Sequence, residues 1–207
     1  MPFDLHEVEV RVLGALVEKD MATPEYYPLS LNALVNACNQ KSNREPVVSY
    51  EDATVSDALQ LLKNRKLAFV QTGDRVPKYG HRASETLNVN NRELAVLTVL
   101  MLRGPQTVCE LKTRTERLHN FDDLDSVEST LRILAEKGLA AQLPKQPGSR
   151  ENRWAHLLSG EPVFTEGPVA ASSQSPTYDY LAQRVAQLET EVDMLKTQFA
   201  EFKKQFE

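Results

Sequence analysis

"VSDALQLLKNRKLA", residues 55–68, decides the fold, because much of it recurs later in the chain as "VESTLRILAEKGLA", residues 127–140. Val55 and Val127 open the two stretches, and three leucines and the final alanine match at the same offset of 72 residues. Apolar residues three and four positions apart predict a helix with one buried face, and the closing Leu-Ala begins an extended segment. The chain therefore contains a duplicated unit of helix followed by strand.

Three further pairs of segments align in the same order. "EVRVLGAL" from Glu9 lies over "ELAVLTVL" from Glu93, and "PLSLNAL" from Pro28 lies over "PQTVCEL" from Pro105. "KYGH" and "RWAH" match after each duplicated helix. Four segments repeated in one order indicate two copies of one small domain, the first with longer loops.

Each copy reads as three helices followed by a two-stranded ribbon. Val10, Leu13, Leu16 and Val17 form a core-facing stripe in the first helix. After the third helix, "LAFVQTGDRVPKYGH" and "LAAQLPKQPGSRENRWAH" each offer two extended segments around a turn. Three helices and a ribbon make a winged helix. We therefore expect a mainly α fold with small β-ribbons (α+β), with tandem winged-helix domains at residues 1–83 and 84–158.

Three blocks of the sequence resemble the signature blocks of the YceH family of bacterial proteins. They are "YPLSLNALVNACNQKSNREPV", "LMLRGPQTVCEL" and "LPKQPGSRENRWAHLL". The similarity covers about residues 3–160. The resemblance implies two tandem winged-helix domains, in agreement with the repeat, and it implies no catalytic residue.

The end of the chain has a different pattern. Residues 159–177 are rich in Pro, Gly, Ser and Ala and predict a flexible linker. Residues 178–207 then keep a heptad in which Tyr178 starts at position a, as in a two-stranded coiled coil. The predicted dimerisation seam consists of Leu181, Val185, Leu188, Val192, Leu195, Phe199 and Phe202. The alternative is an amphipathic helix that folds back on its own domains, since coiled coils this short are marginal alone.

A polar, amide-rich stretch, "CNQKSNREPV" at residues 38–47, joins the second and third helices of the first copy. Asn39 suits a left-handed helix cap, and Ser49 with Asp52 suits a capping pair for the next helix. Four side chains of this stretch have no such structural role. Their chemistry suits contacts with phosphates, base edges or a protein partner, and they are Gln40, Lys41, Asn43 and Arg44. The alternative is a loop that is merely solvated.

Charge is unevenly distributed along the chain. The whole chain has a net charge of −5, yet residues 41–83 carry an excess of basic residues. Both third helices begin with carboxylates, which suit a helix N-terminus and disfavour phosphate contact there. The remaining predicted contacts lie at the end of the third helix and on the two wings, and they are Lys63, Arg65, Lys66, Arg75, Lys78, Arg82, Lys145 and Arg150. The alternative is that the basic side chains of the wings are merely solvated and bind no ligand.

Several classes of function lack their sequence signals. The chain has no Gly-rich phosphate loop, H-E-x-x-H or G-x-S-x-G motif, so we expect neither an enzyme nor a small-molecule substrate. Two cysteines and four dispersed histidines offer no metal-ligand spacing, and we expect no cofactor and a buried Cys38 thiol. No apolar run is long enough to span a bilayer, and the start of the chain predicts no secretory signal, so we expect a cytoplasmic protein.

Two functions fit this pattern. The first is a dimeric, DNA-associated and regulatory protein that contacts double-stranded DNA through its wings and the loop of residues 40–44. The second is a protein interaction scaffold that uses the winged helices and the coiled coil without binding DNA. The fold and the local basic charge favour the first, and the acidic third helices favour the second.

Overall fold

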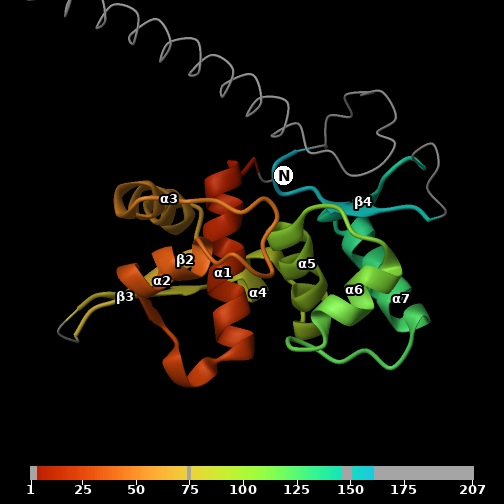
Figure 1. The fold of residues 1–207 in the computed structure, drawn as a ribbon, viewed down its shortest axis with the longest axis horizontal. Helices are drawn as coiled ribbons and strands as arrows, with labels where there is room; N and C mark the ends of the chain where they lie inside the picture. The colour runs from red at the N-terminus through yellow and green to blue at the C-terminus, as the bar shows by residue number, and fades with distance from the viewer. Residues whose placement is uncertain (1–3, 74–75, 146–150, 161–207) are drawn as a thin grey trace, which may run out of the picture. The chain divides into compact units, whose positions relative to one another are not determined.

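Two helices that are buried on all sides form the centre of the fold. α1 (Glu7–Ala22) is buried from Glu9 to Val17, and α5 (Asn91–Arg103) is buried from Glu93 to Leu102. Figure 1 shows these helices side by side between the other elements. The computed structural model describes residues 4–73, 76–145 and 151–160, all of which belong to one compact unit.

A glycine permits the close contact between the central helices. A Cβ atom at Gly14 would lie 2.9 Å from Leu102 Cδ2 and 3.2 Å from Met101 Cβ. The stripe expected on α1 is buried, and Val12 and Ala15 on its other side are buried as well. The additional burial follows from the packing of α5, which a single amphipathic stripe does not predict.

The first half of the unit surrounds α1. α2 (Leu31–Cys38) and α3 (Asp52–Asn64) pack against α1 and against each other. The strands β2 (Ala68–Gln71) and β3 (Lys78–His81) then pair antiparallel, with Val70 opposite Tyr79. Between α1 and α2 lie the short 3₁₀ helix η1 (Pro24–Tyr26) and the strand β1 (Leu29–Ser30), which pairs with the other edge of β3.

The second half follows the same order around α5. The short α4 (Ala83–Leu87) leads into α5, which packs against α6 (Val108–Thr115) and α7 (Leu124–Glu136). The strands β4 (Ala140–Gln142) and β5 (Trp154–His156) form the second ribbon. A single antiparallel bridge joins Gln106 to Trp154, where the aligned residues of the first half, Leu29 and Tyr79, pair in β1 and β3.

The observed elements confirm the expected α+β class. The described part of the chain contains seven α-helices and small antiparallel sheets. α3 and α7 each span 13 residues, and both their first and their last residues keep the offset of 72 found in the sequence. The domain division at residues 83 and 84 stays a prediction. The linker beyond residue 160, the helix 178–207 and its seam lie outside the described residues.

The same ion pair ties the first helix to the third in both halves. Glu9 and Glu93 accept hydrogen bonds from the N-cap backbone N–H groups of α1 and α5, at 2.9 and 3.1 Å. Arg65 Nε lies 3.3 Å from Glu9, and Lys137 Nζ lies 2.6 Å from Glu93. Arg65 and Lys137 also keep the offset of 72 and are the C-cap residues of α3 and α7. Each basic side chain therefore connects the third helix to the first helix of its own half.

Candidate nucleic-acid interface

Two hydrogen bonds between the Asn39 side chain and the Tyr50 backbone close the loop of residues 39–51. The Asn39 amide donates to Tyr50 O at 2.8 Å and accepts from Tyr50 N at 2.8 Å. Asn39 has φ −88°, so the left-handed cap expected there is wrong. The Ser49 and Asp52 capping pair is also wrong, because Glu51 is the N-cap residue of α3 and no side chain caps that end.

Arg44 is a buried structural residue of this loop. Its Nη atoms lie 3.0 and 2.5 Å from the two carboxylate oxygens of Glu18 on α1. The guanidinium also donates to Ala37 O at the end of α2, at 2.9 and 3.1 Å. The side chain is 0% exposed. The structure therefore corrects the prediction for Arg44, whose guanidinium holds the loop to α1 and α2 and is not available to a ligand.

The loop also fastens the first half of the unit to α5. Glu45 N donates to Leu102 O at 2.9 Å, and the Arg103 guanidinium donates to the Asn43 side chain. Arg11 on α1 donates to Pro46 O at 2.6 Å. The amide-rich segment therefore connects the two central helices, which explains its length beyond that of a simple turn.

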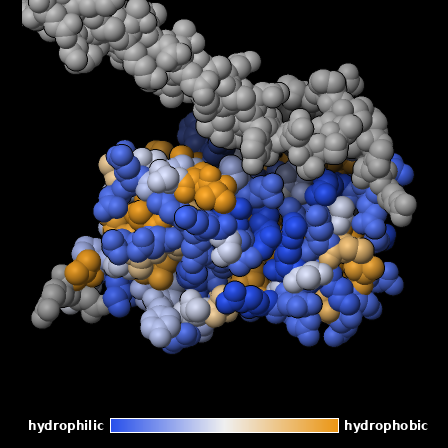
Figure 2. Space-filling view, in the orientation of Figure 1, coloured by the Kyte–Doolittle hydropathy of each residue, from blue (hydrophilic) through white to orange (hydrophobic). Residues whose placement is uncertain are grey.

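A cleft of about 530 Å³ lies beside this connection, and we name it the inter-repeat cleft. It is bounded by the end of α1, the loop, α5 and α6. Gln40 and Asn43, two of the predicted contact residues, line it. The basic side chains that line it are Lys19, Arg103, Arg114 and Arg117. Figure 2 shows strongly hydrophilic residues gathered across the middle of this face, between α1 and α6.

The basic groups of the inter-repeat cleft are only partly neutralised. Burial lowers the pKa of Arg103, and the neighbouring guanidinium groups of Arg114 and Arg44 lower that pKa further. Two carboxylates, Glu18 and Glu116, also line the cleft; Glu18 is bonded to Arg44 and lies 3.8 Å from Lys19, and Arg114 lies 3.7 Å from Glu110. Crowded like charges in a partly buried site favour an incoming anion. The inter-repeat cleft therefore has the electrostatic character of a phosphate-binding surface.

The other predicted contact residues do not line the inter-repeat cleft. Lys41, Lys66 and Lys145 are exposed, and Lys78 lies in β3. Lys63 Nζ donates to Gln60, and Arg82 stacks 5.6 Å from the centre of the Phe69 ring. Arg65 is engaged by Glu9 and by Asp4 O. Arg75 and Arg150 lie outside the described residues.

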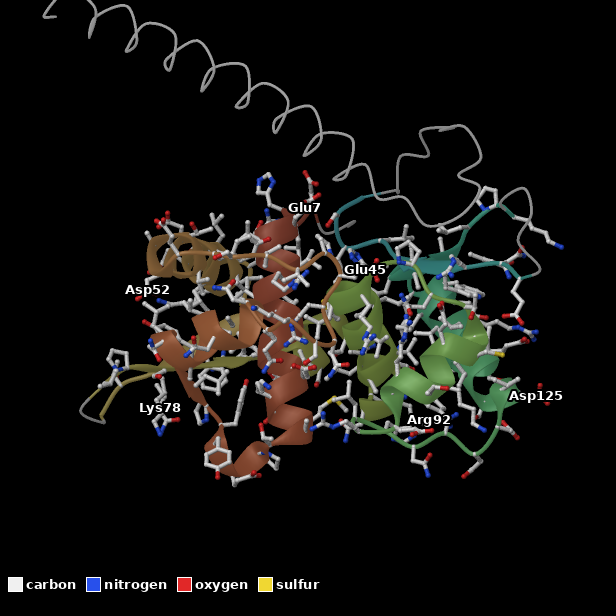
Figure 3. All side chains as sticks on the ribbon, viewed as in Figure 1. Glu7, Glu45, Asp52, Lys78, Arg92 and Asp125 are labelled. Carbon is white, nitrogen blue, oxygen red and sulfur yellow. The ribbon has the colours of Figure 1, made fainter. Side chains whose placement is uncertain are left out.

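The third helices present carboxylates to solvent, as the sequence predicts. Asp52 and Asp57 are exposed on α3, and Asp123 and Asp125 are exposed at the start of α7. Asp123 accepts a 2.8 Å hydrogen bond from Ser126 N, and this bond lowers the pKa of Asp123. Figure 3 shows Asp52 and Asp125 at opposite sides of the view. Neither residue lines the inter-repeat cleft.

The sequence interpretation missed all four basic residues of the inter-repeat cleft. Lys19, Arg103 and Arg114 lie on three different helices and Arg117 lies in the turn after α6, so no local run of charge brings all four together. A weak signal exists in "KTRTER" at residues 112–117, which holds Arg114 near the end of α6 and Arg117 in the turn that follows it.

Other kinds of site find little support in the described part of the chain. No group of three or more potential metal ligands occurs among these residues, and no helix among them is long and apolar enough to cross a membrane. Cys38 is buried as expected, and burial raises the pKa of its thiol to about 12.

The described residues define an α+β protein in which two similar halves, each with three packed helices and an antiparallel ribbon, are joined by the short α4 and share a core. The chain belongs to the bacterial family described as "Protein of unknown function, DUF480", which matches residues 5–149. A "UPF0502 protein" of Solibacter usitatus (strain Ellin6076) is 52% identical over 208 residues and covers 100% of both chains. "UPF0502 protein GSU0233" of Geobacter sulfurreducens is 49% identical over 216 residues, or 98% of each chain. These matches confirm the family resemblance found in the sequence.

Proposed function

We propose that this protein is a cytoplasmic, non-enzymatic, DNA-associated regulator built from two tandem winged-helix domains. Each half has three helices and a ribbon in the order of a winged helix, and in the first half β1 adds a third strand beside β3. The offset of 72 residues between α3 and α7 supports an internal duplication. Fold alone does not specify a ligand, so the functional argument rests on the inter-repeat cleft.

The observation that carries the proposal is the group of basic side chains in the inter-repeat cleft. Arg103, Arg114 and Arg117 lie beside the amides of Gln40 and Asn43 in one cleft. Guanidinium groups bind phosphate oxygens, and amide side chains bind both phosphates and base edges. In a chain of net charge −5, such a local basic surface directs a polyanion to one place.

The proposed binding surface therefore differs from that of a helix-turn-helix protein that reads DNA with its third helix. The carboxylates at the start of α3 and α7 repel phosphates. Exposed Lys41 lies in the loop that borders the inter-repeat cleft, and the wings add Lys78 and Lys145 away from it. Lysine and arginine side chains at these positions contact mainly the phosphate backbone of DNA, so we expect a modest preference for DNA sequence.

We further propose that residues 178–207 form a dimeric coiled coil. The support is the heptad pattern of the sequence, in which the apolar positions recur without exception. A dimer presents two inter-repeat clefts to one duplex. Two linked sites bind more tightly than one because the second contact is intramolecular.

The direct test is the binding of a labelled DNA duplex to the full-length chain over a range of salt concentrations. We expect binding that weakens with salt, with a log–log slope of about −2 to −4 for two to four phosphate contacts per copy. A sulfonated dye or an acidic peptide of the same charge as the duplex serves as a control, because its binding measures electrostatic attraction that is not specific to DNA. Failure to bind duplex DNA even at low salt contradicts the proposal.

A second candidate is a protein interaction scaffold, and one observation favours it. Leu61 on α3 and Ile133 on α7 occupy equivalent positions and are 44% and 40% exposed. Both lie on helices that carry exposed carboxylates, a combination that suits a protein segment with apolar and basic residues. Substitution of Leu61 and Ile133 by serine leaves DNA binding unchanged if the first proposal holds. Loss of a protein partner with these substitutions, in the absence of DNA binding, supports the scaffold.

A further inference from the structure

A second cavity, of about 320 Å³, lies between the two halves and is distinct from the inter-repeat cleft. We name it the Arg11 pocket. Its walls come from α1, from residues 45–50, from the end of α5 and from β5. A cavity of this volume is of the size that holds a small organic molecule.

Arg11 is a buried cation without a carboxylate partner. The residue is 4% exposed, and its guanidinium donates to Cys38 O at 3.4 Å and to Pro46 O at 2.6 Å. No ion pair to Arg11 is found within the described ranges, whereas Arg44, the other buried arginine there, bonds to Glu18. Carbonyl dipoles satisfy two donors but do not neutralise the charge, so a buried guanidinium of this kind favours an anionic group beside it.

A second polar group of the Arg11 pocket has a ring nitrogen without a hydrogen-bond partner. His156 lines the pocket, and its buried Nδ1 atom has no hydrogen-bond partner among the described residues. Burial lowers the pKa of His156 to about 4, so the ring is neutral at neutral pH. A neutral imidazole offers one N–H donor and one acceptor to a bound molecule.

The remaining walls restrict which anion fits. Val10, Val48 and Met101 supply apolar surface, which suits a ligand with a hydrocarbon body. The exposed carboxylates of Glu7 and Glu45 also line the pocket. Figure 3 shows Glu7 at the upper end of α1 and Glu45 on the neighbouring loop. These carboxylates disfavour a multiply charged phosphate and are compatible with a ligand ammonium group.

We propose that the Arg11 pocket binds a small carboxylate with an apolar body, of the size of an amino acid. Its carboxylate group pairs with Arg11 and accepts a hydrogen bond from the imidazole N–H of His156. The hydrocarbon part lies against Val48 and Met101. A bidentate carboxylate uses the remaining guanidinium donors and supplies the missing negative charge. Because its walls come from both halves of the unit, an occupied pocket stabilises the contact between them. This inference does not depend on DNA binding.

The test uses the full-length protein with L-leucine and L-phenylalanine, their N-acetyl forms and their carboxamides. Each compound is added at about 10 mM, and the melting temperature is measured. We expect at least one free acid to raise the melting temperature by about 2 °C or more. The carboxamides have no negative charge and should have no effect. The N-acetyl acids show whether the ligand ammonium contributes, and binding by either acid form supports the proposal.

Two neighbouring valines provide matched variants. Val48→Trp fills the Arg11 pocket and should abolish the ligand-induced rise, whereas Val47→Trp changes a residue that is 56% exposed and outside the lining. Arg11→Lys keeps the charge but loses the bidentate geometry, and it should weaken binding by about tenfold. In NMR spectra, the ligand should shift the imidazole signals of His156 and leave those of His81 and His119 unchanged. Equal effects of acids and carboxamides, or no effect of any compound, would overturn the proposal.

Discussion

Arg44 in the loop between α2 and α3 forms a two-point ion pair with Glu18 on α1, with nitrogen–oxygen distances of 3.0 and 2.5 Å. The guanidinium is fully buried, and the carboxylate side chain is 14% exposed. The same loop bonds to the end of α5 through Glu45 N and Leu102 O. This ion pair therefore fixes the segment that connects the two halves and that forms one wall of the inter-repeat cleft.

Substitution of Arg44 should destabilise the protein strongly. We expect Arg44→Met to lower the free energy of unfolding by about 3–5 kcal/mol, because it leaves a partly buried carboxylate without its partner. Lys41→Ala is the matched control in the same loop, and its effect should stay within about 0.5 kcal/mol because Lys41 is exposed. Urea unfolding measures both. An equally small effect of the two substitutions would show that Arg44 does not hold the loop.

The backbone after each third helix provides a second prediction. Lys66 has φ +62° and its counterpart Gly138 has φ +70°, so both are left-handed and only one is a glycine. Lys66→Gly should raise the free energy of unfolding by about 1 kcal/mol, because glycine adopts this conformation without strain. Gly138→Ala should lower it by a similar amount, since a Cβ there meets no atom within 4 Å and only the backbone is strained. Destabilisation by Lys66→Gly would contradict this account.

The repeated helices could be predicted from the sequence because local spacing determines them. Apolar residues such as Leu59 and Leu131 keep the helical period and are buried at 2% and 0% exposure. The ribbons could also be predicted from the sequence, since each has two extended segments around a turn. The contact of α1 with α5 could not be predicted in the same way. It depends on two helices far apart in the sequence and on the missing side chain of Gly14.

The candidate site was predicted only in part, for a related reason. Gln40 and Asn43 were recognised because they belong to a continuous polar stretch, and both line the inter-repeat cleft. Arg44 belongs to the same stretch but is buried. Its burial could not be predicted, because composition does not reveal which side chain of a loop turns inward. His81 and His156 stand at matching positions of the two repeats, yet Asp20 lies 3.1 Å from His81 Nε2 while His156 Nδ1 has no partner among the described residues.

Acid sensitivity should follow from His156. Its pKa of about 4 in the folded protein lies below the ordinary value of 6.5, so the unfolded chain binds the proton more readily. The neutral ring is fully compatible with folding above about pH 6.5, and stability is lost as the pH falls from about 6.5 to about 4, by up to about 3 kcal/mol. The measurement is urea unfolding over this pH range.

His156→Gln isolates this contribution, because the carboxylates that also titrate at low pH remain in the variant. We expect the variant to lose less stability than the wild type between pH 6.5 and pH 4. His119→Gln removes a histidine that lies outside the Arg11 pocket and should keep the wild-type dependence. Parallel curves for the wild type and His156→Gln would refute the prediction.

The proposed coiled coil makes a prediction about mass. Deletion of residues 178–207 should convert a dimer to a monomer in sedimentation equilibrium while both halves stay folded. Leu188→Lys in the apolar seam should have the same effect, whereas Thr190→Lys at heptad position f should leave the dimer intact. An unchanged mass after the deletion would exclude the tail as the dimer contact.

The salt dependence of DNA binding by the double variant Arg114→Gln with Arg117→Gln tests the central claim most directly. Both guanidinium groups line the inter-repeat cleft, so their loss should reduce affinity and make the log–log salt slope shallower by up to about two units per copy. Arg92→Gln with Arg132→Gln removes the same charge from α5 and α7 outside that cleft and should leave the slope nearly unchanged. Melting temperatures of both variants establish that the fold is intact. The account predicts a shallower slope for the cleft variant alone, and equal slopes for the two double variants would contradict it.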